Sequence, residues 1–358
     1  MSSPVRHGSA EDVHELISAL RPLPPGFRNS TTTLRIGNFL PERYRPKIHL
    51  CGNGIAEHHR SGWAFAIEQL RDLHALDGIS FDDFVEKKFS RTGRASAKHA
   101  LPYTEPWVGI LHNPPGVPHW FNTDEQAPQF ILQDERWLRS LPYCRGLFTL
   151  STYLRDWLAR RVPVPVESLM HPTGPPGLIF SPSAYQENYS KGIVQVGWWL
   201  RRFHSLYLLP TTRLQKILLH IGEPWVESAI RAELGFVPTD LRNNVRVVDY
   251  LTNMEYDRLL SRNLVFLDLY DSSANNALIE CIVRGTPVLV NPLDAVVEYL
   301  GVDYPLYFDN LAEAAAKAEN LALVLNAHEY LMDSPNRVRL SGQYFLESVA
   351  ESKIYQSL

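Results

Sequence analysis

The sequence has few cysteines, no long apolar run and little net charge. Its three cysteines, Cys51, Cys144 and Cys281, lie far apart in apolar contexts, which is not the spacing of a disulfide framework and fits a reducing cytoplasm. No apolar run approaches the ~18–20 residues that a membrane-spanning helix needs, and the N-terminus has no hydrophobic signal core. A net charge of −4 gives no electrostatic reason to expect nucleic acid as a partner. These absences predict a cytoplasmic protein without a transmembrane segment.

Length and composition favour a globular protein of two domains. A chain of 358 residues with 45% hydrophobic residues, 26 prolines and 20 glycines is ordinary for two α/β domains. Residues 1–45 are expected to form an extension with one amphipathic helix over 10–20. The Gly-Pro-Pro-Gly run at 174–177, which a polar stretch follows, predicts a linker at which two domains could hinge. The predicted parts of the chain are an extension (1–45), a first domain (46–178), a second domain (179–335) and a terminal helix (336–358).

Strands and helices alternate along both predicted domains. Apolar runs that end in glycine or polar residues predict strands, and apolar residues recurring every three or four positions predict the helices between them. Because helical crossovers join parallel strands, this alternation predicts an α/β protein with two doubly wound domains. Helices are expected, among other places, over 130–141, 311–325 and 336–357.

The most informative stretch, 263–305, contains a complete strand, loop, helix and strand. An apolar run at 264–269 predicts a buried strand, the polar turn 271–274 follows it, and 286–290 predicts a second strand. In parallel sheets, ligands bind beyond the carboxyl ends of the strands, where this polar turn is expected to lie. The turn and the helix after it are therefore the first candidates for a binding site.

The helix in this stretch has recognisable ends. Asn275 or Asn276 is a suitable N-cap, and Gly285 is placed to end the helix as a C-terminal glycine cap. Glu280 follows the helix start by about one turn, so its carboxylate is close enough to reach a ligand held at the N-terminus.

The motif Asn276-x3-Glu280, the run Gly-Thr-Pro-Val from 285 and Glu298 together resemble the donor-site signature of GT-B glycosyltransferases, especially the retaining family-four (glycosyltransferase group 1) type. In that family the second Glu of a pair grips the ribose hydroxyls, and Glu280 matches it, although Cys281 stands where alanine is usual. The first Glu faces the transferred sugar. Its position falls here on Ser272, and Asp271 is the nearest substitute.

The resemblance implies a GT-B fold, in which two Rossmann-like domains face a cleft that binds a nucleotide sugar. The first strand of the second domain ends at Gly197, whose backbone would approach the diphosphate. Arg201 or Arg202, and then Lys216, match in order the cations that neutralise the phosphates; a solvated helix position is the alternative for each. Fixed cations are needed because the departing nucleoside diphosphate gains negative charge. The residues implied to shape the donor sugar pocket are Asp271, Ser272, Asn275, Asn276 and Ala277.

Four features of the first domain are candidates for the site: His112 as a catalytic residue that faces the reacting centre, and the other three on the acceptor side. The Gly52-Asn53-Gly54 turn after a strand lets backbone N–H groups approach a ligand, although a turn that needs positive φ explains it equally. His112 follows the strand 107–111 and can donate to a sugar hydroxyl or act as a general acid or base; the alternative is a histidine satisfied by backbone carbonyls. His119 could extend an acceptor loop. Ser151 places a hydroxyl at a strand end, although N-capping alone would explain it.

No metal or cofactor is expected beyond the nucleotide sugar as co-substrate. The chain has no Asp-x-Asp pair, and His58-His59 has no further ligand at metal spacing. The hypothesis is a glycosyltransferase that moves a sugar from a UDP-, GDP- or dTDP-sugar to a glycan, lipid-linked or small-molecule acceptor, with retention of anomeric configuration. A sugar-nucleotide epimerase of the same fold would need more carboxylates in the first domain. A non-catalytic binding or assembly subunit is the third possibility, which Ser272 supports.

Overall fold

The structure, a computed structural model, describes most of the chain from residue 42 onward. The described residues are 42–50, 62–95, 101–121, 125–219, 228, 231–233, 235, 244–248 and 251–358. Residues Arg43–Leu358 belong to one compact unit. The helix expected over 10–20, the Gly52-Asn53-Gly54 turn and His58-His59 lie outside the described residues.

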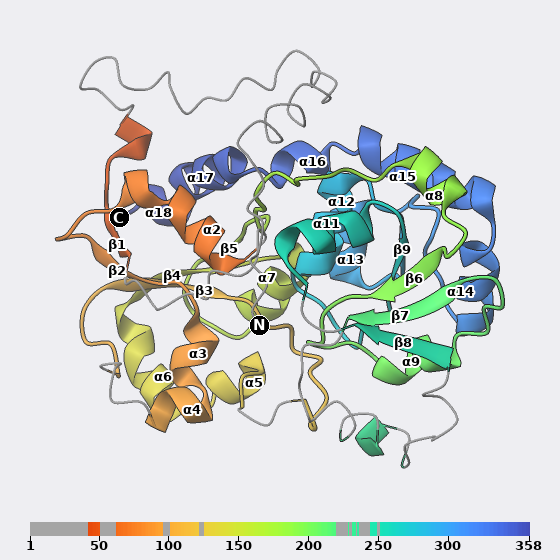
Figure 1. Cartoon of the computed structure of the whole chain (residues 1–358). Helices are drawn as coiled ribbons and strands as arrows, with labels where there is room; N and C mark the ends of the chain where they lie inside the picture. The colour runs from red at the N-terminus through yellow and green to blue at the C-terminus, as the bar shows by residue number, and fades with distance from the viewer. Residues whose placement is uncertain are drawn as a thin grey trace, which may run out of the picture. The chain divides into compact units, whose positions relative to one another are not determined.

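The first sheet has five parallel strands in the order β1-β2-β3-β4-β5 (Figure 1). They are β1 (Ile48–Leu50), β2 (Ile79–Asp82), β3 (Trp107–Leu111), β4 (Cys144–Thr149) and β5 (Val166–Ser168). Alternate residues of β3 pack on opposite faces. Val108 and Ile110 join one hydrophobic cluster with α2 (Trp63–Gln69), whereas Trp107 joins another with α3 (Val85–Phe89). The strand is therefore buried on both faces, as a strand of a parallel sheet should be.

The second sheet has five parallel strands in the order β10-β9-β6-β7-β8. They are β6 (Gly192–Gln195), β7 (Gln215–Leu219), β8 (Val245–Val248), β9 (Leu264–Leu267) and β10 (Val288–Val290). The chain adds strands outward from β6 in one direction and then returns to its other side with β9. This reversal puts a topological switch point between β6 and β9, the place where open α/β sheets bind ligands.

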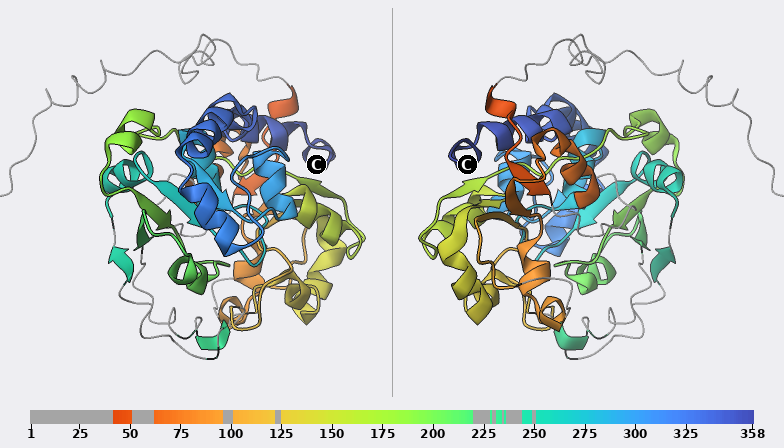
Figure 2. Two further views of the ribbon diagram at one scale, coloured as in Figure 1. Left: turned by 90° about the vertical axis from the view of Figure 1, so that its right-hand side faces the viewer. Right: turned by 90° about the vertical axis from the view of Figure 1, so that its left-hand side faces the viewer.

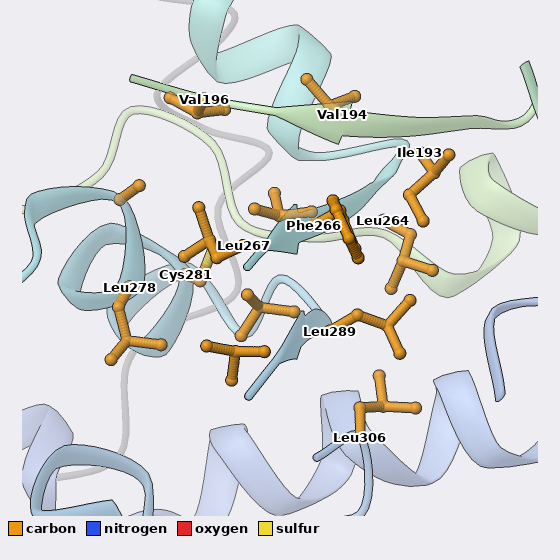
Figure 3. Packing of buried hydrophobic residues seen from close by; sticks show 14 of the residues in the cluster. Ile193, Val194, Val196, Leu264, Phe266, Leu267, Leu278, Cys281, Leu289 and Leu306 are labelled. Carbon is orange, nitrogen blue, oxygen red and sulfur yellow. The ribbon is translucent and has the colours of Figure 1, made fainter. Parts of the chain in front are cut away.

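Helix α12 (Asn276–Arg284) packs its apolar side against this sheet. Figure 3 shows Leu278 and Cys281 of α12 facing the core that Leu267 of β9 and Leu289 of β10 help to form. All four side chains are buried. Burial of this face fixes the position of the helix, and with it the position of Glu280.

The other helices cover the faces of the two sheets or connect their strands. They are α4 (Arg91–Ala95), α5 (Pro128–Ile131), α6 (Glu135–Ser140), α7 (Thr152–Ala159), α8 (Pro182–Glu187), α9 (Phe203–Leu208), α11 (Asn253–Leu260), α13 (Asp294–Leu300), α14 (Leu311–Ala318), α15 (Leu321–Asp333), α16 (Asn336–Arg339), α17 (Gly342–Glu351) and α18 (Lys353–Gln356), with the 3-10 turns η2 (Glu42–Tyr44), η3 (Arg71–Leu73) and η4 (Leu141–Tyr143). In the part of the chain described, none of the helices has the length and apolar character needed to cross a bilayer.

Three predicted helices are wrong in extent because capping residues divide them. The segment 336–357 forms α16, α17 and α18, since Ser341 and Ser352 have extended backbones and cap the helix that follows. Asp134 caps α6 and separates it from α5, and Asn320 caps α15 and separates it from α14. The terminal helices α17 and α18 contact α2 and β4, so the blue end of the chain lies beside the first sheet (Figure 2).

Candidate functional site

The start of α12 lies just beyond the carboxyl end of β9, at the switch point of the second sheet. Asn275 is the N-cap, because its Oδ1 accepts a hydrogen bond from the backbone N–H of Leu278 at 3.2 Å. Gly285 ends the helix in the left-handed conformation, with φ 66°, as the sequence predicted. The first N–H groups of a helix have no partner within it, so this end carries partial positive charge and suits an anion.

The start of α12 lines a cavity of about 530 Å³. Its walls come from the part of the chain that carries the first sheet and from the part that carries the second. Its lining unites nine of the predicted site residues: His112, Gly197, Arg201, Asp271, Ser272, Asn275, Asn276, Ala277 and Glu280. It also includes aromatic and charged residues that the sequence analysis did not single out, among them Trp63, Phe84, His171, Tyr256 and Arg284. The cavity is therefore the place where any chemistry predicted from these residues would occur.

Arg201 supplies a cation to the cavity although only 7% of the residue is exposed. Its Nη2 donates to Oδ1 of Asn275 at 3.0 Å, and its Nη1 and Nε donate to the carbonyls of Trp199 and Val196. Burial lowers the pKa of the guanidinium to about 10, which leaves it charged at neutral pH. Gly197, with φ 76°, lets the turn close against this group, since a Cβ there would lie 3.1 Å from Nη2.

Glu280 lines the cavity and is held in a buried network. Its Oε2 lies 3.7 Å from Nη2 of Arg284, and the hydroxyl of Tyr256 hydrogen-bonds its carboxylate. Arg284 also pairs with Asp257 of α11 at 2.6 Å, and both side chains are almost fully buried. The carboxylate therefore has a fixed position one turn into α12, on the same cavity wall as the helix start.

Asp271 joins segments of the two sheets at the cavity. Its Oδ2 accepts from the N–H of Gly116 at 2.7 Å and from the hydroxyl of Tyr153 at 3.1 Å, and its Oδ1 accepts from the N–H of Ser272 at 2.7 Å. A Cβ at position 116 would lie 2.5 Å from Oδ2, so this approach requires glycine. Burial raises the pKa of Asp271. Because both oxygens already accept hydrogen bonds, the carboxylate is placed to shape the cavity wall.

His112 directly follows β3 and lines the cavity. Its Nε2–H donates to the carbonyl of Asp83 at 3.0 Å, and because a carbonyl can only accept, the proton of the neutral ring lies on Nε2. Burial lowers the pKa of His112 to about 3, so it is not a general acid at neutral pH. Glu86 accepts the backbone N–H groups of His112 and Asn113, the latter at 2.7 Å, and thereby fixes the turn after β3.

His171 and Trp63 are cavity residues that the sequence analysis missed. His171 is 4% exposed and its Nδ1–H donates to the carbonyl of Pro172 at 2.8 Å, while burial lowers its pKa to about 4. The ring of Trp63 lies 4.4 Å from that of His112 and 5.5 Å from that of His171. The available signal for His171 was that it comes shortly after strand β5, much as His112 follows β3.

Two predicted cations lie elsewhere. Lys216 is at the amino end of β7, where its Nζ donates to the carbonyl of Tyr207 at 2.7 Å, whereas the cavity lies at the carboxyl ends of the strands. Arg202 pairs with Asp268 at 3.1 Å and stacks over Tyr270 with 5.0 Å to the ring centre. Of the cations that the resemblance implied for a diphosphate, the structure brings Arg201 to the cavity and not these two.

Two predicted acceptor-side residues also lie outside the cavity lining. Ser151 caps α7 by accepting from the N–H of Leu154 at 3.2 Å, and its hydroxyl lies 3.1 Å from that of Ser273. His119 is exposed beside Trp120, with 4.8 Å between ring centres. For metals, the side chains in the described ranges include no cluster of three or more His, Cys, Asp or Glu that could hold an ion.

Two parallel five-stranded sheets with helices, and a cavity at the switch point of the second sheet, match the GT-B fold of glycosyltransferases, so the predicted fold is confirmed. The structure is similar to that of sucrose-phosphate synthase from Thermosynechococcus elongatus, with a TM-score of 0.55 and 14% identity over 85% of each chain. It is also similar to the trehalose-6-phosphate protein of E. coli bound with UDP-2-fluoro glucose, with a TM-score of 0.53 and 13% identity over 82% of this chain and 77% of that one. A third similar structure is Anabaena HepE in complex with UDP and glucose, with a TM-score of 0.51 and 13% identity over 71% of this chain and 72% of that one. No family model and no curated protein sequence matches the chain.

Proposed function

We propose that the protein is a glycosyltransferase that moves a sugar from a nucleotide diphosphate sugar to an acceptor hydroxyl. The observation that carries this proposal is the convergence of Arg201, the start of α12 and Glu280 on one cavity. A guanidinium beside a helix N-terminus suits a diphosphate, and a carboxylate one turn away suits the two hydroxyls of a ribose. Two structurally similar proteins hold UDP with glucose or UDP-2-fluoro glucose, which supports this choice of ligand.

In the proposed reaction the bond between sugar C1 and the diphosphate oxygen breaks, and the departing nucleoside diphosphate takes the electron pair. Arg201 and the N–H groups of Asn276 and Ala277 would stabilise that charge without a metal ion. The acceptor hydroxyl forms the new bond to C1 and loses its proton. Asp271 and Ser272 would shape the sugar end of the cavity. The resemblance to the family-four type favours retention of configuration and an acceptor that is a glycan, a lipid-linked sugar or a small molecule.

Calorimetry with UDP, GDP and dTDP tests the binding half of the proposal. We expect one of the three to bind the wild type and both Arg201→Met and Glu280→Gln to weaken it about 10- to 100-fold, because each removes a charge-assisted hydrogen bond. Arg246→Met is the matched control, since Arg246 is exposed on β8 and does not line the cavity. Failure of all three nucleotides to bind the wild type would contradict the proposal.

Slow hydrolysis of the donor tests the catalytic half. A competent transferase releases nucleoside diphosphate from its nucleotide sugar even without acceptor, and Arg201→Met should slow that release by about 30- to 1,000-fold. A protein that binds nucleotide but releases none from any nucleotide sugar would instead be the non-catalytic subunit that Ser272 left open.

A further inference from the structure

The side chains of two histidines and one tryptophan lie together on one wall of the cavity. This wall is formed by the part of the chain that carries the first sheet. His112 comes after β3, His171 after β5 and Trp63 at the start of α2, so three separate segments bring the group together. The Trp63 ring lies 4.4 Å from the His112 ring, nearly perpendicular to it, and 5.5 Å from the His171 ring. Phe84 stacks on His112 with 4.1 Å between ring centres. These packed rings hold the three polar side chains in place.

The hydrogen bonds of the two histidines fix which ring nitrogen is the acceptor. Nε2 of His112 donates to the carbonyl of Asp83, so Nδ1 is its acceptor. Nδ1 of His171 donates to the carbonyl of Pro172, so Nε2 is its acceptor. Burial lowers both pKa values, to about 3 and about 4, and both rings are neutral at physiological pH. The indole Nε1–H of Trp63 is buried and donates to no acceptor in the described part of the chain.

This set of groups suits hydroxyls and not anions. A sugar hydroxyl can donate to a neutral imidazole nitrogen and accept from an indole N–H. A phosphate or carboxylate oxygen has no proton to donate at neutral pH, so it would face two lone pairs. The anion-binding groups, Arg201 and the start of α12, belong to the second sheet's segment. The cavity therefore has one wall for negative charge and another for neutral hydroxyls.

We propose that His171 and Trp63, together with His112, form a subsite that binds the hydroxyl groups of an uncharged donor hexose and discriminates against an anionic sugar. This inference rests on the proposed function, because it assigns the sugar end of the same nucleotide-sugar site. His171 and Trp63 are binding residues in it, beyond the residues that the donor-site motif marks.

Exchanges of histidine for asparagine or glutamine separate ligand binding from a structural role. An asparagine amide can replace Nδ1, and a glutamine amide can replace Nε2. His171→Asn thus keeps the donor to Pro172 and loses the acceptor, whereas His171→Gln does the reverse. At His112 the pattern is crossed: Gln keeps the donor to Asp83 and Asn keeps the acceptor. Trp63→Phe removes the N–H and keeps most of the ring.

The test is calorimetry with UDP, UDP-glucose and UDP-glucuronate, or with GDP, GDP-mannose and GDP-mannuronate if GDP is the nucleotide that binds. We expect His171→Asn, His112→Gln and Trp63→Phe each to lower the ratio of the nucleotide Kd to the hexose-ester Kd about 3- to 10-fold, the effect of one lost hydrogen bond, with the nucleotide Kd unchanged. His171→Gln and His112→Asn should retain the ratio. The wild type should bind the uronate at least about 10-fold more weakly than the hexose ester.

Tyr189→Phe, at a fully exposed position, is the control and should leave the ratio unchanged. An unchanged ratio in His171→Asn and Trp63→Phe, with normal nucleotide binding, would overturn this inference and leave the proposed function intact. Greater damage from His171→Gln than from His171→Asn, or tighter binding of the uronate, would overturn it as well. If no nucleotide binds the wild type, the proposed function fails and the inference fails with it.

Discussion

Replacing His171 by asparagine should change how the stability of the protein depends on pH. His171 is 4% exposed, and burial lowers its pKa from 6.5 to about 4. Between these values the unfolded chain binds a proton that the folded protein does not, so His171 reduces the free energy of unfolding as the pH falls through this window. The contribution is fully present above about pH 6.5 and is lost toward pH 4.

The size of the effect follows from the two pKa values. From 6.5 down to pH 5 is 1.5 pH units, and at about 1.4 kcal/mol per unit the wild type loses about 2 kcal/mol through this residue relative to pH 8. The asparagine variant keeps the hydrogen bond to Pro172 but has nothing to protonate. Hence the free energy of unfolding of His171→Asn, relative to that of the wild type, should be about 2 kcal/mol higher at pH 5 than at pH 8.

Urea unfolding of both proteins at pH 8 and pH 5 measures this difference. Glu86, whose pKa burial raises to about 8, has the opposite pH dependence, but it is present in both proteins and cancels in the comparison. The same holds for Asp271, whose pKa is also raised. A difference between variant and wild type that is equal at the two pH values would refute the assignment of His171 as a buried neutral imidazole.

Three further predictions concern stability. In urea unfolding, Arg284→Met should lower the free energy of unfolding by about 3–5 kcal/mol, because it removes the cation from between two buried carboxylates. Adding Asp257→Asn should restore much of that loss. An unchanged free energy of unfolding in the single variant would contradict the pairing. In the same assay, Gly285→Ala should lower the free energy of unfolding by about 2 kcal/mol, because φ at this position is 66° and the new Cβ would lie 2.7 Å from Sδ of Met332. No change in the free energy of unfolding would count against this helix end. Between pH 5 and pH 8, the free energy of unfolding of Glu86→Gln should rise by about 3 kcal/mol relative to that of the wild type, because a raised carboxyl pKa makes the wild type lose stability as the pH rises. A difference between the two proteins that stays constant with pH would contradict the burial of that carboxyl.

Local signals in the sequence were sufficient for the unit around α12 and insufficient elsewhere. The strand, the asparagine cap, the glycine end and the second strand lie within 263–305, so short-range rules identify them. Strand β2 was missed because Ile79–Asp82 is short and ends in an aspartate; pairing with β1 and β3 stabilises it. The long terminal helix was predicted because apolar periodicity continues across Ser341 and Ser352, although their caps break the backbone.

The same limit applies to the site. Asp271, Asn275 and Glu280 were predicted because one loop and one helix turn carry them together. Lys216 was predicted from its order in the chain, but β7 begins at Gln215, which places the lysine at the amino end of the strand, away from the cavity. His171 lies after β5, and its approach to Trp63 depends on tertiary packing that no local pattern encodes.

Whether Glu280 binds ribose can be measured most directly by calorimetry with the nucleotide that binds and its 2′,3′-dideoxy analogue. If the carboxylate accepts the ribose hydroxyls, the dideoxy analogue should bind the wild type about 10- to 100-fold more weakly, and Glu280→Gln should bind both nucleotides with nearly equal, weakened affinity. A Glu280→Gln protein that still prefers the ribonucleotide as strongly as the wild type would contradict the assignment of this cavity as a nucleotide-sugar site organised around α12.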